Sequence, residues 1–333
     1  MNKKNLLLFF LACSVALASF NSCKKSDDKD SNTDTGPTEW TRASAFDGDP
    51  RNGAASFQIE DKGYLVSGIL KTNERVKDAW QFDISSGEWS NLAEFIGSAR
   101  HGAVGFAIDG KGFVGSGFDG ETALTDFYKY DPSSNSWSQI ADFPGEGRHG
   151  AVAFALDGYG YVGLGANEKD KTFKDFYKYD PTNDTWTQIS TTFKYKRKNA
   201  FAFVIGDKAY VGGGIDNNQY PEDFYSFDGD EWKPLRDLKI DDSNSTYDVT
   251  RQAASTFVIG NNAFLVGGKK GNVINTVWKY DPSADRWSGD SQAFLGSARE
   301  DAVSFSSDSK GYITTGANGS NKFDDTWEFK PVR

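Results

Sequence analysis

Short hydrophobic segments separated by glycine-rich turns recur along the chain from Trp40 onward. A tight turn such as "DGKG" or "IGDK" leads into an apolar segment that ends in glycines, for example "FVGSG" or "YVGGG". A longer polar stretch then leads to an aromatic segment such as "DFYKYDP". Short segments rich in aromatic and β-branched residues and bounded by Gly, Asp and Pro are typical of β-strands. The pattern therefore predicts an all-β chain of many short strands.

These segments belong to a repeat. The stretch "SARHGAVGFAIDGKGFVGSG", which begins at Ser98, returns as "EGRHGAVAFALDGYGYVGLG" from Glu146. Its arginine recurs at spacings of 49, 48, 49, 54 and 48 residues, with Ala three residues later and Phe six residues later. The six arginines are Arg51, Arg100, Arg148, Arg197, Arg251 and Arg299. A period of this length is typical of propeller blades, so the sequence predicts six repeat units.

The motifs inside each unit resemble those of a known family. Arg-x-Gly-Ala, a glycine-rich strand, and Tyr-Asp-Pro with Trp six residues after the Asp are similar to the kelch repeat, and the likeness extends from Trp40 to the C-terminus. The resemblance implies a six-bladed kelch-type β-propeller, with four antiparallel strands in each blade around a central channel.

The tryptophan spacing predicts how the ring closes. Trp40 stands 11 residues before Arg51, the same distance that separates Trp89 from Arg100, so Trp40 corresponds to a fourth-strand tryptophan without its first three strands. The sixth unit ends at "DDTWEFKPVR", before its own fourth strand. We therefore expect the N-terminal "EWTRAS" to complete the last blade of a propeller domain over residues 40–333, which leaves no free sheet edge.

The N-terminal segment has the features of a targeting signal. Lys3 and Lys4 precede an apolar run from residue 6 to residue 20, the charge order of a secretory signal. The stretch "FNSCKKSDDKD" resembles a bacterial lipoprotein signal, which implies a signal peptide over residues 1–22 and lipidation of Cys23. Cys13 is the competing lipidation site, and an ordinary cleaved signal is the alternative to both.

The segment that follows the predicted lipidation site is polar and acidic. Residues 23–39 contain no large apolar run and are expected to form a flexible linker. Ser26, Asp27 and Asp28 are similar to the acidic tags of surface-exposed lipoproteins. This resemblance implies a lipid-anchored protein on the surface of a bacterial outer membrane, with the anchor as its sole membrane contact.

Charge and cysteine content exclude several functions. The net charge of −10 and the pI near 4.9 disfavour nucleic-acid binding, which needs clustered Lys and Arg. The only cysteines, Cys13 and Cys23, precede the repeats, so the propeller has neither disulfides nor thiol chemistry. We expect a monomer that uses no cofactor.

The loops that vary most are expected on the face where the arginines lie, because the second-to-third and fourth-to-first connections both reach that face. Six arginines there suggest an anion site that binds a carboxylate of a glycan or a peptide. An Asp before the aromatic strand of every unit except the fifth offers a structural partner instead, and a residue that recurs through the repeats usually serves the repeat. These partners are Asp78, Asp126, Asp175, Asp223 and Asp325, with Asn275 in the fifth unit.

The residue after each arginine is polar and, apart from a pair of histidines, differs between units. These six positions are Asn52, His101, His149, Lys198, Gln252 and Glu300. His101, His149 and Glu300 could form an acid–base set, or the histidines could be hydrogen-bonded scaffold residues. Two histidines are too few for a catalytic zinc site, so no metal is expected.

The connecting loops supply further candidate ligand contacts. Those with suitable side chains are Phe118, Phe173, Tyr220, Lys269 and Lys270, whose rings could stack on sugars and whose amines could bind anions. The connection that contains residues 238–249 is eight residues longer than its counterparts and lies on the same face.

Three functions fit this scaffold. The first is a non-catalytic surface lipoprotein that binds a glycan or a protein partner through the loop face. The second is a sugar epimerase or mutarotase that resembles the kelch-type sialic-acid epimerases. The third is a copper oxidase of the galactose-oxidase type, which needs a tyrosine crosslinked to cysteine. No cysteine follows Cys23, so oxidase activity is disfavoured and the binding function is preferred.

Overall fold

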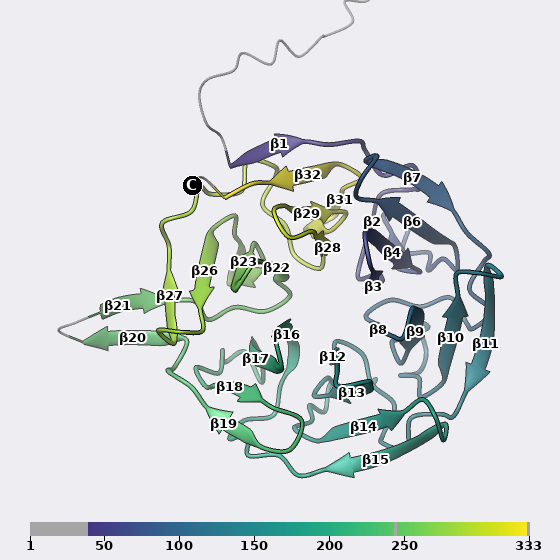
Figure 1. Ribbon diagram of the computed structural model, residues 1–333, viewed down its shortest axis with the longest axis horizontal. Helices are drawn as coiled ribbons and strands as arrows, with labels where there is room; N and C mark the ends of the chain where they lie inside the picture. Colours follow the sequence, from purple (N-terminus) through teal and green to yellow (C-terminus); the bar gives the residue numbers. More distant parts are fainter. Residues whose placement is uncertain (1–38, 243–244, 332–333) are drawn as a thin grey trace, which may run out of the picture. The chain divides into compact units, whose positions relative to one another are not determined.

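A computed structural model describes residues 39–242 and 245–331, and in this range the chain is all β. Six four-stranded antiparallel sheets form a closed ring around a central channel (Figure 1). The predicted six-bladed kelch-type propeller is confirmed. The predicted signal peptide, Cys23 and the linker up to residue 38 lie outside the described residues.

In five of the blades the strands follow chain order from the channel outwards. Blade 1 contains β3 (Ala55–Ile59), β4 (Lys62–Val66), β6 (Ala79–Asp83) and β7 (Glu88–Asn91). Blade 2 contains β8 (Val104–Ile108), β9 (Lys111–Gly115), β10 (Phe127–Asp131) and β11 (Ser136–Ile140). Blade 3 contains β12 (Val152–Leu156), β13 (Tyr159–Gly163), β14 (Phe176–Asp180) and β15 (Thr185–Ile189).

The second half of the ring follows the same plan. Blade 4 contains β16 (Lys198–Ile205), β17 (Lys208–Ile215), β18 (Phe224–Phe227) and β19 (Trp232–Pro234). Blade 5 contains β22 (Ser255–Ile259), β23 (Asn262–Val266), β26 (Val277–Asp281) and β27 (Arg286–Ser288). Blade 6 contains β28 (Val303–Ser306), β29 (Gly311–Thr314), β32 (Thr326–Phe329) and β1 (Trp40–Arg42).

Short strand pairs extend some of the loops. They are β2 (Arg51–Asn52) with β5 (Ile69–Leu70), β24 (Lys269–Lys270) with β25 (Asn272–Val273), β30 (Ala317–Asn318) with β31 (Asn321–Lys322), and β20 (Lys239–Asp242) with β21 (Ser245–Asp248). The β20–β21 hairpin is the eight-residue excess that the sequence placed on the loop face, and it projects outwards from the ring (Figure 1). Ile240 pairs with Tyr247 in it, and Tyr247 is buried against blade 5.

The first strand closes the ring as the sequence predicts. β1 pairs antiparallel with β32, with Trp40 opposite Phe329 and Arg42 opposite Trp327. The indole of Trp40 is buried, and its Nε1 donates to the carbonyl oxygen of Gln292 at 3.2 Å. Its ring lies 4.9 Å from the ring of Phe294, centroid to centroid. The N-terminal strand therefore removes the edge that blade 6 would otherwise expose.

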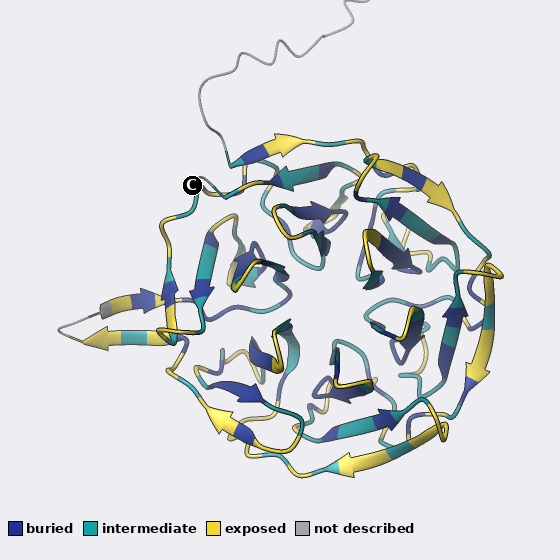
Figure 2. Cartoon of the chain, viewed as in Figure 1, coloured by how far each residue is buried: buried dark blue, intermediate teal, exposed yellow. Residues whose placement is uncertain are grey.

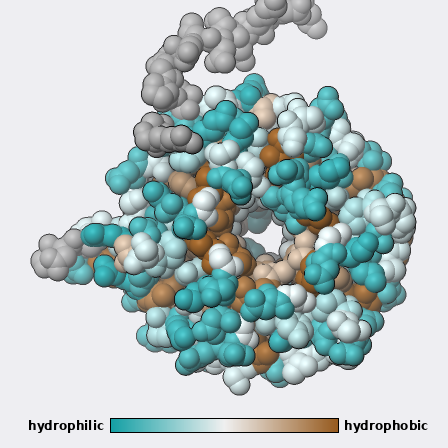
Figure 3. All heavy atoms as spheres, viewed as in Figure 1, coloured by the Kyte–Doolittle hydropathy of each residue, from teal (hydrophilic) through white to brown (hydrophobic). Residues whose placement is uncertain are grey.

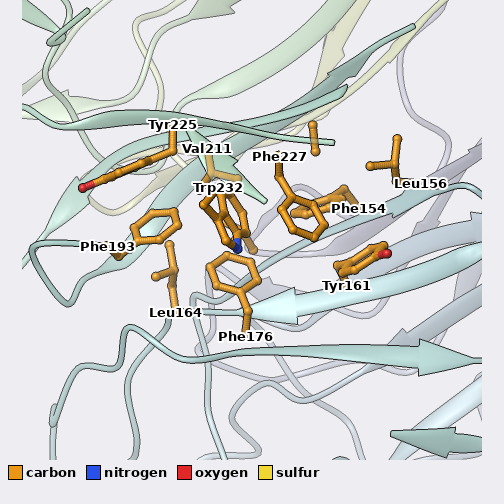
Figure 4. Packing of buried hydrophobic residues seen from close by; sticks show 12 residues of the cluster. Phe154, Leu156, Tyr161, Leu164, Phe176, Phe193, Val211, Tyr225, Phe227 and Trp232 are labelled. Atoms are coloured by element: carbon orange, nitrogen blue, oxygen red, sulfur yellow. The ribbon is translucent and has the colours of Figure 1, made fainter. Parts of the chain in front are cut away.

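The hydrophobic core lies between neighbouring blades. Buried residues follow the inner strands, whereas exposed ones concentrate at the turns and on the outermost strands (Figure 2). In the cluster of Figure 4, Trp232 of blade 4 contacts Phe176 and Phe154 of blade 3 and lies 4.6 Å from Phe227 of its own blade. Each such cluster joins two blades, so no blade buries its apolar surface alone.

The repeated phenylalanine packs against a small residue of the next blade. A Cβ added to Gly112 of β9 would lie 2.1 Å from a ring carbon of Phe57 in the preceding blade. Gly160 has the same relation to Phe106, at 2.3 Å. The regular spacing of Phe after Arg is therefore explained by packing between blades.

Candidate functional site

The innermost strands surround a channel whose opening is visible at the centre of Figure 3. Phe57, Ala107 and Val204 are among the small and apolar residues that line a cavity of about 360 Å³ within it. The polar positions identified in the sequence precede these strands, at the end of the channel on the loop face. We call this end the channel mouth and define it by the residue that follows each repeat arginine.

A closed ring of backbone hydrogen bonds surrounds the channel mouth. The N–H of Gly102 donates to the carbonyl oxygen of Gly53 at 2.8 Å, and the bond recurs between every pair of neighbouring blades at 2.7–3.0 Å. All six participants have a left-handed φ between 52° and 62°. They are Gly53, Gly102, Gly150, Asn199, Ala253 and Asp301. The Arg-x-Gly motif thus provides a backbone conformation that glycine adopts without strain.

The repeat arginines are buried and paired. Arg100 is 0% exposed, and its Nη1 and Nη2 donate to the two carboxylate oxygens of Asp126 at 2.7 and 2.8 Å. Its Nε donates to the carbonyl oxygen of Ser98 at 2.8 Å. The other four ion pairs are Arg51–Asp78, Arg148–Asp175, Arg197–Asp223 and Arg299–Asp325. These five guanidinium groups serve the scaffold, so we do not include them in the candidate ligand site.

The fifth blade differs from the other five. The residue that precedes its aromatic strand is Thr276, so the sequence alignment that put Asn275 in the aspartate position was wrong by one residue. The backbone hydrogen bonds confirm this register. The carbonyl oxygen of Thr276 accepts from the N–H of Gly267, just as the carbonyl oxygen of Asp126 accepts from the N–H of Ser116. Arg251 is 2% exposed and donates through Nη1 to the hydroxyl oxygen of Thr276 at 3.1 Å.

Both histidine rings contact the ring of Phe118. The ring of Phe118 is 5.8 Å from that of His101 and 5.7 Å from that of His149. Nε of Arg75 donates to Nδ1 of His101 at 3.0 Å. Burial and then the Arg75 charge lower the pKa of His101 to about 4, and burial also lowers the pKa of His149. Both imidazoles are therefore neutral at physiological pH.

Glu300 belongs to a different part of the channel mouth. Its carboxylate pairs with Lys269 at 3.3 Å. Among the described residues no hydrogen bond or ion pair joins Glu300 to His101 or His149. The three residues of the predicted acid–base set are thus divided between the histidine side and the lysine side of the channel mouth.

The lysine side contains a polar cavity of about 410 Å³, which we call the mouth pocket. Lys198, Gln252 and Glu300 line it from the variable positions of blades 4, 5 and 6. Its other lining residues are Asp170, Thr172, Asn199, Ile215, Asn217, Asn218 and Lys269. Lys198 pairs with Asp170, and the amide of Asn199 donates to Oε1 of Gln252 at 3.2 Å. The pocket thus offers cationic, anionic and amide groups together.

Asp301 is a functional candidate that sequence reasoning missed. Burial, with a contribution from the Glu300 charge, raises the pKa of its carboxyl to about 6. Oδ2 of Asp301 accepts from the amide of Asn52 at 3.2 Å, and Oδ1 of Asn52 accepts from Lys322. The signal in the sequence was an Asp at the position where the first three units have Gly.

The remaining predicted contacts lie in separate places. Phe173 covers the guanidinium of Arg148 at 4.5 Å and so belongs to the scaffold. The hydroxyl oxygen of Tyr220 accepts from Gly271 N–H at 2.8 Å, and Tyr220 lines a second cavity of about 390 Å³ with Tyr195, Asp216 and Asp237. Lys270 contacts Asp248 and Thr250.

The described residues contain no group of three or more His, Cys, Asp and Glu side chains placed to hold a metal ion. In the same range, no helix has the length and apolar character needed to cross a membrane.

Six four-stranded blades, with a buried arginine at the same point of each, define a kelch-type β-propeller. The family model of the KLHDC2/KLHL20/DRC7 Kelch-repeats domain matches residues 23–214 and 141–293, and the chain belongs to this kelch-repeat family. No curated protein matches the chain. The solved structure of YjhT resembles it with a TM-score of 0.71 at 17% identity, over 85% of this chain and 95% of YjhT. At this identity the likeness shows the fold alone.

Proposed function

We propose that this protein is a non-catalytic binding protein that holds a glycan in the mouth pocket. In this proposal a lipid on Cys23 anchors the protein to the surface of a bacterial outer membrane, and residues 23–39 connect the lipidated cysteine to the propeller. The observation that supports a glycan is the polar lining of the mouth pocket at the end of the channel.

The chemistry of the mouth pocket suits a sugar. Sugar hydroxyls donate and accept hydrogen bonds, and the pocket supplies donors from Lys198 and Lys269 and acceptors from Glu300 and Asp170. The amides of Asn217, Asn218 and Gln252 supply both. A volume of about 410 Å³ lies within the range of small-ligand sites. A rigid scaffold that presents variable polar residues is a common design for binding proteins.

A glycan array screened with the purified propeller, from Glu39 onward, tests the proposal. We expect a subset of glycans to bind, and we expect Lys269→Ala and Gln252→Ala to weaken that binding by about tenfold or more, because each removes a hydrogen-bonding group. Both side chains lie at the surface of the pocket, so the free energy of unfolding should change by less than about 0.5 kcal/mol.

Lys208→Ala is the matched control. Lys208 is an exposed lysine at the start of β17, next to the short turn of blade 4 at the opposite end of the channel. This variant should bind like the wild type. Binding of no glycan by the wild type would contradict the proposal, and capture of a protein partner through the same pocket would replace the glycan with a protein.

The alternative is a sugar epimerase or mutarotase, and Asp301 is the observation that favours it. A carboxyl group with a pKa of about 6 can accept and return a proton near neutral pH. Proton NMR of free reducing sugars with catalytic amounts of protein tests this function. Faster exchange between anomers or epimers, abolished in Asp301→Asn, would replace the binding proposal with the enzymatic one.

A further inference from the structure

Arg251 differs from the other five repeat arginines because it has no carboxylate partner. In the other blades an aspartate neutralises the buried guanidinium. In blade 5 the donors of Arg251 go to neutral oxygens: Nε to Val249 at 3.1 Å, and Nη1 to the carbonyl of Gly267 at 2.9 Å and to Thr276. Its Nη2 donates to no described residue.

Arg251 also lacks the phenylalanine ring that covers each of the other five repeat arginines. Phe95 lies 5.0 Å below the guanidinium of Arg100, and Phe46, Phe143, Phe193 and Phe294 cover their arginines in the same way. Leu238 occupies the equivalent position before Arg251. Its backbone N–H donates to the carbonyl oxygen of Glu222, just as the backbone N–H of Phe95 donates to the carbonyl oxygen of Lys77. No aromatic ring within the described residues covers Arg251. A buried positive charge is therefore left without either of its usual compensations.

The other charged groups of this region do not satisfy Arg251. Asp248 is close enough to favour the charged guanidinium, but its carboxylate accepts from Lys270 and Thr250. Burial nevertheless lowers the pKa of Arg251 to about 10, so the side chain is charged at neutral pH. Thr276 is exposed, and its side chain is shorter than the aspartate that occupies this position elsewhere. Solvent can therefore approach the place where the missing carboxylate would lie.

We propose that Arg251 and Thr276 form a binding site for a carboxylate, which takes the place that an aspartate occupies in the other five blades. Nη2 of Arg251 would donate to one carboxylate oxygen, and the Thr276 hydroxyl would donate to the other. A charge-assisted hydrogen bond of this kind is stronger than one between neutral groups, and burial strengthens it further. Neither residue lines the mouth pocket, so the site is distinct from the proposed glycan site.

Thermal unfolding of the full chain in detergent, with chloride replaced stepwise by acetate at constant ionic strength, tests the site. The melting temperature of the wild type should rise with acetate, because a ligand that binds only the folded state stabilises it. Thr276→Asp supplies the carboxylate from the chain itself, so this variant should melt higher than the wild type without acetate and should gain nothing from acetate. Thr276→Val leaves the position open but removes the hydroxyl donor, so its response to acetate should be weaker than that of the wild type without being abolished.

Asp325→Thr provides an independent control in blade 6. It removes the carboxylate from Arg299, so it should lower the melting temperature and then recover part of the loss as acetate is added. Equal acetate responses in the wild type and Thr276→Asp would overturn the proposal. Should Thr276→Asp fail to fold, saturation-transfer NMR on the wild type decides the question, and no transfer to acetate would contradict the site.

Glucuronate in a parallel titration distinguishes the source of the carboxylate. A larger response to glucuronate than to acetate at equal concentration assigns the site to an acidic sugar. A larger response to acetate assigns it to a small free carboxylate. Both results require the response to disappear in Thr276→Asp.

Discussion

One residue in each blade determines the shape of the channel mouth. The left-handed φ of the six ring residues costs glycine nothing, but it strains Ala253 by about 1 to 2 kcal/mol. Asp301 is the sole charged member of the ring, and its φ is 53°. Backbone strain in this ring is thus concentrated on the side of blades 4 to 6, where the mouth pocket lies.

Replacement of Asp301 by asparagine should stabilise the protein at about pH 7.5 by about 1 to 3 kcal/mol. Burial raises the pKa of the native carboxyl from 3.8 to about 6, so the folded state holds this proton more tightly than the unfolded state. The resulting stabilisation is complete below about pH 4 and is lost as the pH rises through about 6. Asparagine tolerates the same φ and carries no charge.

Urea unfolding of the wild type and Asp301→Asn at about pH 4 and about pH 7.5 measures this effect. The gain from the substitution should be large at the higher pH and close to zero at the lower one. A gain of equal size at both values would show that the charge of Asp301 does not destabilise the fold.

At the scale of the strands, the repeated residues pack neighbouring blades against each other. The second strand of a blade provides a small residue, and the phenylalanine of the preceding blade packs against it, as Phe57 does against Gly112. Blades 4 and 5 have Ala209 and Ala263 at this position instead of glycine. The tolerance for a methyl group therefore differs between interfaces.

Gly112→Ala should lower the free energy of unfolding by about 1 to 3 kcal/mol, because the new Cβ would lie 2.1 Å from the ring of Phe57. Phe57→Leu removes that ring and should lower stability on its own. The two losses should be less than additive in the double variant, since the substituted side chains meet at one interface. Strict additivity in thermal or urea unfolding would refute this contact.

The sequence predicted the strands and blades because each repeat has the same internal contacts. It did not predict that residues 239–248 pair as a hairpin, because that segment has no counterpart in other units. It also misplaced the aspartate position of blade 5 at Asn275, since the loop before Thr276 differs in length from its neighbours. Single-unit features such as these depend on tertiary contacts that a repeat pattern does not contain.

At the scale of the whole molecule, the ring is closed and the mouth pocket lies at the loop-face end of its channel. Closure through β1 followed from the spacing of Trp40. A fourth-strand tryptophan that precedes the first blade can complete only the last blade, which lacks its own fourth strand. Blade order places His101 and His149 in the adjacent blades 2 and 3, apart from Glu300 in blade 6, but it does not specify which side chains contact one another across the mouth. Asp301 and the mouth pocket were therefore found in the structure.

A crystal structure of the propeller soaked with the glycan selected on the array tests the central claim most directly. The account predicts sugar density in the mouth pocket, within hydrogen-bonding distance of Lys269 and Glu300, with the paired repeat arginines unmoved. Density only at the opposite end of the channel, beside Gln58 and Asp61, would contradict it.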